Sequence, residues 1–369
     1  MNESAVAATL QPTPLAAHLT AAGKQPALAE YRAVASPGML DAPQVEAEAL
    51  ARSAAVHDLG WFRRVAVRGE DRFRWLSGMV TNTVRDLAPG TGAWNLVLNA
   101  QGRIQGDLTV WREEDNLEIV LDASQYDRLL AHLNHFIIMD DVELVPIGQE
   151  TGAEETTLGL TGPAASDVLT RMGLPTLPEP MTCTRIEYNG LDLCLRRYWG
   201  VLAEHYALWT PIAGITRLWR NLCTAGALPV GFASLDAFRI AEGIPSYGVD
   251  IVERDLPQET SQMRALHFNK GCYLGQEIVE RIRSRGSVHR NLCALELTGS
   301  VPAAGTELTL AGTSVGHVTS AAELALPGGC RIFALAMLKS EAKTAGEPFT
   351  WNAGNTTGTA RILAAPPSL

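Results

Sequence analysis

The chain has 369 residues, of which 46% are hydrophobic and 19% are charged, and its formal net charge at pH 7 is −10. This length exceeds what a single hydrophobic core usually supports, so we expect two or three globular domains. The acidic balance argues against a general binder of nucleic acid or of anionic membranes. No apolar run reaches the roughly 18 residues that a membrane-spanning helix needs.

The six cysteines form neither a C-x-x-C pair nor a zinc-like spacing. We therefore predict no metal site and reduced thiols, as is usual for a cytoplasmic protein. The first ten residues lack the basic start of a secretory signal, which agrees with that location.

The first part of the chain alternates helices and strands. Residues 1–12 are small and polar, and we expect them to be disordered. Thr13 followed by Pro14 is a typical helix start, and Gly23 is a typical stop. Tyr31 to Met39 reads as an irregular or hairpin segment with its turn at Pro37-Gly38. The other predicted elements are helices over 44–53, 70–79 and 126–136 and strands over 64–68, 93–99, 104–111, 117–121 and 142–147.

The same order of elements starts again near Thr156. The predicted strands are 158–161, 183–188, 191–197 and 205–209, and the predicted helices are 164–172, 212–225 and 235–242. Asn189-Gly190 favours a type I′ hairpin turn. From Asn291, six short strands separated by turn residues indicate a small antiparallel barrel or sandwich. We thus predict an α+β fold with modules over 13–150 and 151–289 and a barrel over 290–369.

The stretch Lys270 to Glu277, K-G-C-Y-L-G-Q-E, places a cation, a thiol, a phenol, a carboxamide and a carboxylate within eight residues. A helix is expected to begin near Gly275, which puts Cys272 by its positive end with Lys270 nearby. Both effects favour the thiolate over the thiol. The alternative is a small buried cysteine with a packing role.

This stretch resembles the K-G-C-Y-x-G-Q-E signature of the YgfZ family, folate-binding proteins tied to iron–sulfur cluster maintenance and tRNA modification. The related glycine-cleavage T-proteins, which are aminomethyltransferases, carry K-x-D-F-I-G here, so Cys272 separates the two branches. Further stretches are similar to the superfamily pattern: Thr13-Pro14-Leu15, Val56-His57-Asp58-Leu59 (their V-F-D-L), Asn99 to Leu108 and Val315 to Ser320. The resemblance implies a three-domain ring around a central tetrahydrofolate site.

The resemblance also implies site residues. Asp107 matches the T-protein aspartate that faces the folate, where a carboxylate can accept hydrogen bonds from the N–H edge of a reduced pterin. Asn99 either offers its amide to the ligand or serves the hairpin turn. Arg239 either clamps an anionic group or pairs with Glu242 on the same helix. Further candidates for folate contact are Tyr198, Glu204, Lys270, Gln276 and Glu277.

One T-protein box is altered. R-D-x-L-R-L-E-A-G becomes the segment Leu235 to Gly243, which loses the first arginine and exchanges the order of Glu and Ala. We therefore interpret the chain as a cytoplasmic, monomeric folate-binding protein that supports iron–sulfur assembly or repair in client proteins. Cys272 would be its reactive group, Asp107 would orient the pterin, and both would face one cavity. The alternative is a folate-dependent aminomethyl- or methyltransferase like the T-proteins.

Arg281, Arg283 and Arg285 form a basic patch that follows the cysteine motif. This patch could attract an anionic partner such as tRNA. The simpler interpretation is a solvated segment whose charges pair with Glu277 and Glu280.

Overall fold

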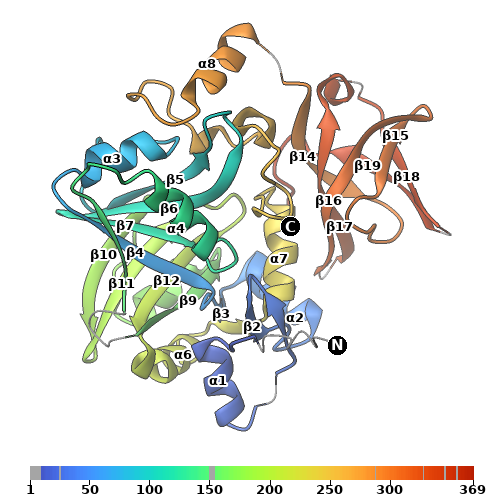
Figure 1. The fold of residues 1–369 in the computed structure, drawn as a ribbon. Coiled ribbons are helices and arrows are strands. Elements are labelled where there is room, and N and C mark those ends of the chain that lie inside the picture. Colours follow the sequence, from blue (N-terminus) through green and yellow to red (C-terminus); the bar gives the residue numbers. More distant parts are fainter. Residues whose placement is uncertain are drawn as a thin grey trace, which may run out of the picture.

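The structure is a computed structural model that describes residues 10–24, 26–148, 154–286, 288–326, 328–344, 346–354 and 356–369. Most of the predicted disordered N-terminus, residues 1–9, lies outside the described residues, whereas Pro12 forms a bridge with Ala35. In the described part, one large sheet lies beside a smaller closed barrel, with helix α7 (Phe232–Ala241) between them (Figure 1). The predicted α+β class with a C-terminal antiparallel barrel is confirmed.

The large sheet combines strands from both predicted modules. Its described strands follow the order β13-β3-β9-β12-β11-β10-β5-β6-β7-β4-β8. Their bounds are β3 Ala55–Asp58, β4 Phe62–Arg68, β5 Thr91–Leu98, β6 Ile104–Glu113, β7 Asn116–Asp122, β8 Glu143–Pro146, β9 Glu155–Gly162, β10 Thr182–Tyr188, β11 Leu191–Tyr198, β12 Glu204–Pro211 and β13 Leu228–Val230. The first-half strand β3 pairs with the second-half strand β9, so a single sheet carries side chains from both halves to one place.

The described helices have bounds within three residues of the predicted ones. They are α1 Pro14–Ala21, α2 Pro43–Arg52, α3 Arg72–Met79, α4 Tyr126–His135, α5 Ala165–Arg171, α6 Ile215–Thr224, α7 and α8 Gln276–Arg285. The Thr13 hydroxyl oxygen accepts a hydrogen bond from the Ala16 N–H at 3.2 Å, which confirms the predicted cap of α1. Within the described ranges, no helix is both long and apolar enough to cross a membrane.

Two turns decide where polar side chains lie. Asn189 and Gly190 both have positive φ, which confirms the predicted type I′ turn between β10 and β11. The expected turn at Pro37-Gly38 is wrong. The hairpin of β1 (Leu28–Tyr31) and β2 (Val34–Pro37) instead turns at Arg32-Ala33, where both residues adopt positive φ, and Pro37 is the last residue of β2.

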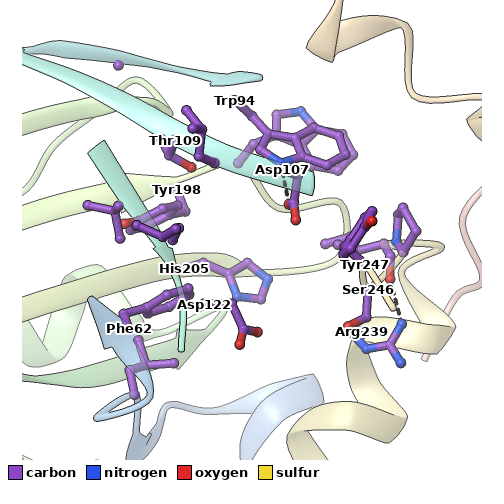
Figure 2. A pocket seen from close by; sticks show the side chains of 18 of the residues that line it. Phe62, Trp94, Asp107, Thr109, Asp122, Tyr198, His205, Arg239, Ser246 and Tyr247 are labelled. Atoms are coloured by element: carbon purple, nitrogen blue, oxygen red, sulfur yellow. Dashed lines mark hydrogen bonds between the residues drawn. The ribbon is translucent and has the colours of Figure 1, made fainter. Parts of the chain in front are cut away.

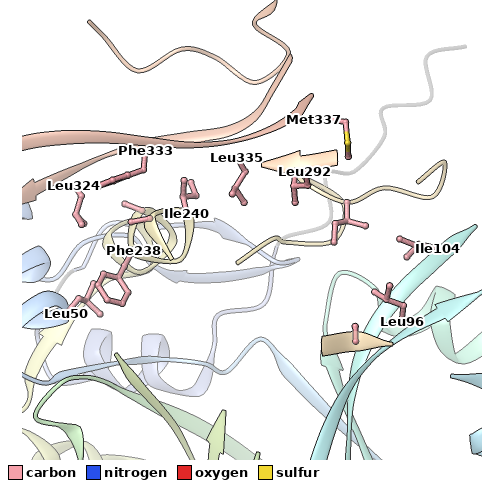
Figure 3. Close-up of a cluster of buried hydrophobic side chains, with 14 of the residues drawn as sticks. Leu50, Leu96, Ile104, Phe238, Ile240, Leu292, Leu324, Phe333, Leu335 and Met337 are labelled. Carbon is pink, nitrogen blue, oxygen red and sulfur yellow. The ribbon is translucent and has the colours of Figure 1, made fainter. Parts of the chain in front are cut away.

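The described strands of the barrel close in the order β14-β17-β16-β15-β18-β19. They are β14 Arg290–Leu297, β15 Glu307–Leu310, β16 Thr313–Leu326, β17 Gly329–Lys339, β18 Phe349–Ala353 and β19 Thr356–Ile362. A continuous apolar core joins this barrel to the rest of the molecule (Figure 3). Phe238 and Ile240 of α7 share that core with Leu50 of α2 and with Phe333 and Leu335 of β17. Burial of these side chains fixes α7, and with it the polar groups that α7 carries.

The cysteine motif packs on the turn between β5 and β6. A Cβ atom at Gly275 would lie 2.6 Å from the Asn99 carbonyl oxygen, and one at Gly102 would lie 2.7 Å from Cβ of Ile278. Both glycines have positive φ as well. The start of α8 can therefore approach this turn only because neither position has a side chain.

Candidate functional site

A cavity of about 510 Å³ opens at the curved face of the large sheet, bounded by α7 and by the β1–β2 hairpin. Aromatic side chains from several elements dominate its wall (Figure 2). These aromatic residues are Tyr31, Trp61, Phe62, Trp94, Tyr198, Trp199, Tyr206 and Tyr247. The volume falls within the range of small-molecule sites, and the mixture of aromatic walls with a few polar groups is typical of them.

Asp107 on β6 is held in the wall of this cavity by two hydrogen-bond donors. Trp94 Nε1 donates to Asp107 Oδ2 at 2.8 Å (Figure 2). Gln125 Nε2 donates to Asp107 Oδ1 at 2.9 Å. The Asp107 backbone N–H returns a bond to Gln125 Oε1 at 3.0 Å, which fixes the amide orientation. Desolvation raises the pKa of Asp107 in spite of these donors, and nearby Asp122 adds to the rise. The raised pKa makes Asp107 easier to protonate than an aspartate in water.

Asp122, at the end of β7, forms a second acidic point of the wall. Its carboxylate pairs with the Arg32 guanidinium and accepts bonds from the Ser124 N–H and hydroxyl, both at 2.8 Å. Arg32 reaches Asp122 because the β1–β2 turn lies at Arg32 itself. The charge of Asp122 is thus compensated by Arg32. Asp107, by contrast, has no cationic partner within hydrogen-bond distance among the described residues.

A series of hydrogen-bonded side chains also lines the cavity. His57 Nδ1 lies 3.3 Å from the Asp58 carbonyl oxygen, and His57 Nε2 lies 3.0 Å from Thr161 Oγ1. Thr161 Oγ1 lies 3.2 Å from His205 Nδ1, and His205 Nε2 lies 3.0 Å from Glu242 Oε1. The chain therefore links strands β3, β9 and β12 to the end of α7.

Counting donors and acceptors assigns the protons of this chain. The Asp58 carbonyl only accepts, so His57 Nδ1 carries the proton; burial lowers the pKa of His57 to about 4, so its Nε2 is an acceptor. Thr161 then donates to His57 Nε2. The Glu242 carboxylate accepts from His205 Nε2–H. Burial opposes ionisation of Glu242, yet His205 and two backbone N–H groups lower its pKa overall.

Two members of this chain stand at departures from the T-protein pattern. His57 replaces the phenylalanine of V-F-D-L, and Glu242 replaces the alanine of E-A-G. The structure brings these two departures together through Thr161 and His205. The altered box therefore supplies one end of this hydrogen-bond chain.

Arg239 lines the cavity but is already paired. Its Nε lies 2.7 Å from Asp236 Oδ1, and its Nη1 lies 2.7 Å from Asp250 Oδ2 and 2.9 Å from the Ile244 carbonyl oxygen. The alternative of a helix pair with Glu242 is wrong, because that carboxylate is held by His205. Arg239 acts through these partners to fix the segment after α7.

Tyr198 and Glu204, at the facing ends of β11 and β12, differ in position. The Tyr198 ring lines the cavity and stacks on Phe62 at 6.4 Å between centroids, and its hydroxyl has no hydrogen-bond partner in the described structure. Glu204 is absent from the cavity wall. Its carboxylate pairs with Arg197 at 3.0 Å and accepts from the Ser166 hydroxyl at 2.6 Å.

Asn99 and Lys270 also lie outside the cavity wall and have local partners. Asn99 Oδ1 accepts from the Gln101 and Arg103 N–H groups, both at 3.0 Å, which is the arrangement of a turn residue. Lys270 Nζ donates to the carbonyl oxygens of Ser77, Val80 and Asn82 at 2.6 to 2.8 Å. Burial lowers the pKa of Lys270, whereas these three carbonyls favour its charged form. Lys270 thus ties the cysteine motif to the C-terminal end of α3.

The expected convergence of Cys272 and Asp107 on one cavity is not what the structure shows. Asp107 lines the cavity, whereas Cys272 is exposed and is not part of the wall. Gln276 accepts from the Tyr273 N–H at 3.3 Å, and Glu277 is exposed on the first turn of α8. The reason is the anchoring of the segment: Tyr273 is buried in the core, so the thiol one residue earlier points to solvent. Roles for these residues stay predictions.

The basic patch lies on the exposed side of α8. Arg281 and Arg283 are exposed, and Arg283 pairs with Glu280 at 3.5 Å. The side chain of Arg285 lies outside the described residues. A contact of this patch with tRNA stays a prediction. Among the described His, Cys, Asp and Glu side chains, no group of three could hold a metal ion.

Sequence reasoning missed several members of the site. Trp94 and Gln125 orient Asp107, and Arg264 lines the cavity from the short helix η3 (Met263–Ala265). Trp94 carried one usable signal, because its strand was predicted to pair with the strand of Asp107. Gln125 lies in the connection before α4, and Arg264 lies in a single-turn helix that has no periodic pattern, so the sequence predicts no side-chain direction for either.

Comparison with known proteins agrees with this architecture. Residues 16–270 match the family model described as the GCVT N-terminal domain. The chain is 28% identical over 316 residues to an aminomethyltransferase of Rubrobacter xylanophilus, covering 85% of this chain and 83% of that protein. It is 25% identical over 312 residues to a putative chloroplastic transferase of Arabidopsis thaliana, covering 82% and 69% of the two chains.

A solved structure confirms the fold. The glycine cleavage system aminomethyltransferase T from Bartonella henselae superposes with a TM-score of 0.85 at 20% identity, over 97% of this chain and 98% of that chain. Because the family model spans well over half of the sequence, the chain belongs to the GCVT N-terminal domain family.

Proposed function

We propose that the cavity binds tetrahydrofolate or a one-carbon derivative of it. The observation that carries this proposal is Asp107, a carboxyl oriented by Trp94 and Gln125 in an aromatic wall. A reduced pterin offers a flat ring for aromatic contact and an N–H edge for a carboxylate. The cavity volume of about 510 Å³ suits a ligand of this size.

Calorimetry with tetrahydrofolate under anaerobic conditions tests the proposal. Asp107→Asn keeps the size of the side chain and removes its charge, so affinity should fall by roughly 10- to 100-fold, the value of one or two charge-assisted hydrogen bonds. Asp115→Asn, at an exposed turn, is the matched control and should bind like the wild type. Equal affinity of the wild type and Asp107→Asn would remove the basis of the proposal.

We further propose that this folate site serves assembly or repair of iron–sulfur clusters through Cys272, as in the YgfZ family. The K-G-C-Y-L-G-Q-E signature supports this, and so does the exposure of Cys272, since an exposed thiol can reach a client protein. One thiolate cannot hold a cluster that usually needs four, so contact with a cluster would be transient. The six cysteines are unpaired, which suits the reducing cytoplasm that we propose as its location.

The recovery of a peroxide-damaged [4Fe–4S] dehydratase in the presence of the protein and tetrahydrofolate tests the role of Cys272. Cys272→Ser should abolish the recovery, and Asp107→Asn should weaken it. Cys330→Ser is the matched control because Cys330 is also exposed but belongs to the barrel. Equal loss in both cysteine variants, or none in either, would contradict a specific role of Cys272.

The second candidate is a folate-dependent aminomethyltransferase. The similarity to curated aminomethyltransferases supports it, and so does the raised pKa of Asp107, which suits proton exchange with a substrate amine. Release of 5,10-methylene-tetrahydrofolate from an aminomethylated carrier protein decides between the two. Turnover that depends on Asp107 and is unchanged in Cys272→Ser would favour this enzyme.

A further inference from the structure

Arg264 lies where two cavities meet. The second cavity has a volume of about 440 Å³ and extends toward barrel strands β14 and β17. Trp199, Glu242 and Arg264 line both cavities. Trp199 is 38% exposed, so this junction is open to solvent.

The Arg264 guanidinium has no polar partner in the described structure. It lies over the Trp199 ring at 3.4 Å and over the Trp94 ring at 4.9 Å, measured from Cζ to the ring centroids. Its Nη1 is buried and makes no hydrogen bond. Burial lowers the pKa of Arg264 to about 10, so the group is still a cation at neutral pH.

The other arginines of the first cavity are paired with carboxylates, so the unpaired guanidinium of Arg264 is unusual. Of the described residues in its wall, three are arginines. Arg32 pairs with Asp122, and Arg239 pairs with Asp236 and Asp250. Glu242, a carboxylate that borders the same junction, is occupied by His205 and by two backbone N–H groups. The charge of nearby Glu242 favours the cationic form of Arg264, but among the described residues no anion is hydrogen-bonded to the guanidinium. A partly buried cation without such a partner is costly unless a ligand supplies the anion.

We propose that Arg264 binds a carboxylate group of the ligand, at the junction of the two cavities. Indole rings cover the guanidinium, so its N–H groups are offered at the edge, where a carboxylate can accept two parallel hydrogen bonds. A singly charged carboxylate fits better than a phosphate dianion, because Glu242 and Asp107 lie close to the junction. This inference rests on the proposed folate site and adds a second point of recognition to it.

The position of Arg264 relative to Asp107 follows from Trp94. The Trp94 N–H donates to Asp107, and the ring of the same residue lies against the Arg264 guanidinium. A pterin held by Asp107 would therefore have the carboxylate site beside it. The carboxylate belongs either to the glutamyl part of the same folate or to a separate small acid that enters through the second cavity.

The first arm of the test compares two ligands by calorimetry. Tetrahydrofolate carries glutamyl carboxylates, and 6-methyltetrahydropterin carries none. If the glutamyl part is the source, Arg264→Gln should weaken tetrahydrofolate by roughly 10- to 100-fold and leave 6-methyltetrahydropterin within twofold of the wild type. Arg128→Gln is the matched control: Arg128 is exposed and lies over the cavity residue Tyr247 at 5.2 Å, so its loss should change neither affinity.

The second arm titrates acetate into the wild type and into Arg264→Gln, each with and without 6-methyltetrahydropterin, and follows tryptophan fluorescence. If a separate acid is the source, acetate should give a saturable change in the wild type that Arg264→Gln lacks. Thermal unfolding of each variant shows whether the fold is kept. Arg264→Lys, which keeps the charge but loses the planar fork, should recover only part of the affinity.

Two results would overturn the inference. One is an equal loss of affinity for both pterin ligands in Arg264→Gln, which would mean that Arg264 contacts the pterin ring or maintains the shape of the cavity. The other is the absence of any difference between wild type and Arg264→Gln in both arms. If the wild type binds neither pterin, the proposed folate function fails by itself, and the acetate titration of the free protein still decides on Arg264.

Discussion

Trp94→Phe should raise the pKa of Asp107 and move the pH dependence of ligand binding with it. The substitution keeps an aromatic ring in the cavity wall and removes the indole N–H that donates to Asp107 Oδ2 at 2.8 Å. The Gln125 bond to the other carboxylate oxygen stays in place. Desolvation and Asp122, which already raise the pKa of Asp107, would then act with one opposing donor fewer.

The size of the effect follows from the lost bond. A hydrogen bond to a charged group contributes about 1.5–3 kcal/mol, and one pKa unit corresponds to about 1.4 kcal/mol. Because Asp107 borders a cavity that water can enter, we expect the lower end of this energy range. The pKa of Asp107 should therefore rise by about one unit. The folded state holds the Asp107 proton to higher pH than the unfolded chain does, so stability falls as pH rises between the two pKa values. Because Trp94→Phe raises the folded pKa of Asp107, it should raise the upper limit of the pH range over which stability falls.

The assay follows the titration of ¹³C-labelled aspartate carboxyl groups by NMR, with Asp107→Asn to assign the signal. In parallel, the affinity for tetrahydrofolate is measured as a function of pH. The loss of affinity on acidification should begin about one pH unit higher in Trp94→Phe than in the wild type. Trp61→Phe removes another indole of the same cavity that makes no bond to Asp107 and should leave the titration unchanged. A downward shift, no shift, or the same shift in both variants would refute the reasoning.

Two further predictions concern the supports of the site. Gly102→Ala should lower the free energy of unfolding by at least about 1 kcal/mol more than Gly190→Ala, measured by urea denaturation. Both glycines have positive φ, but only at Gly102 would the new methyl group collide with Ile278 of α8. At Gly190 nothing lies within 4 Å of that position. Equal losses of unfolding free energy in the two variants would contradict this packing. Glu242→Gln should cost about 1–3 kcal/mol at pH 7 because it discharges the partner of His205. The lowered pKa of Glu242 means that this stabilisation is present above the ordinary glutamate pKa and is lost as pH falls through the folded value. The difference in unfolding free energy between wild type and Glu242→Gln should therefore narrow below about pH 4. A difference that stays constant would count against a stabilising role of the Glu242 charge.

The sequence by itself determined the local elements and the broad architecture. Helix caps such as Thr13, the turn at Asn189-Gly190 and the six short C-terminal strands each depend on neighbouring residues, so their signals are complete within a few positions. The resemblance also selected Asp107, and the structure places it in the cavity wall. The turn at Arg32-Ala33 was missed because positive φ there is imposed by the packing of the hairpin and not by turn-forming residue types.

Only the tertiary structure decided which polar groups meet. The hydrogen-bond chain from His57 to Glu242 joins residues from three strands and the C-terminal end of α7, which no local sequence pattern could have predicted. The separation of Cys272 from Asp107, and the unpaired state of Arg264, depend in the same way on which side chains were taken up by other partners. Hydrogen bonds and ion pairs act over a few ångströms between groups that can be any distance apart in the chain. Residue types therefore show which groups can pair, and only the folded structure shows which of them do.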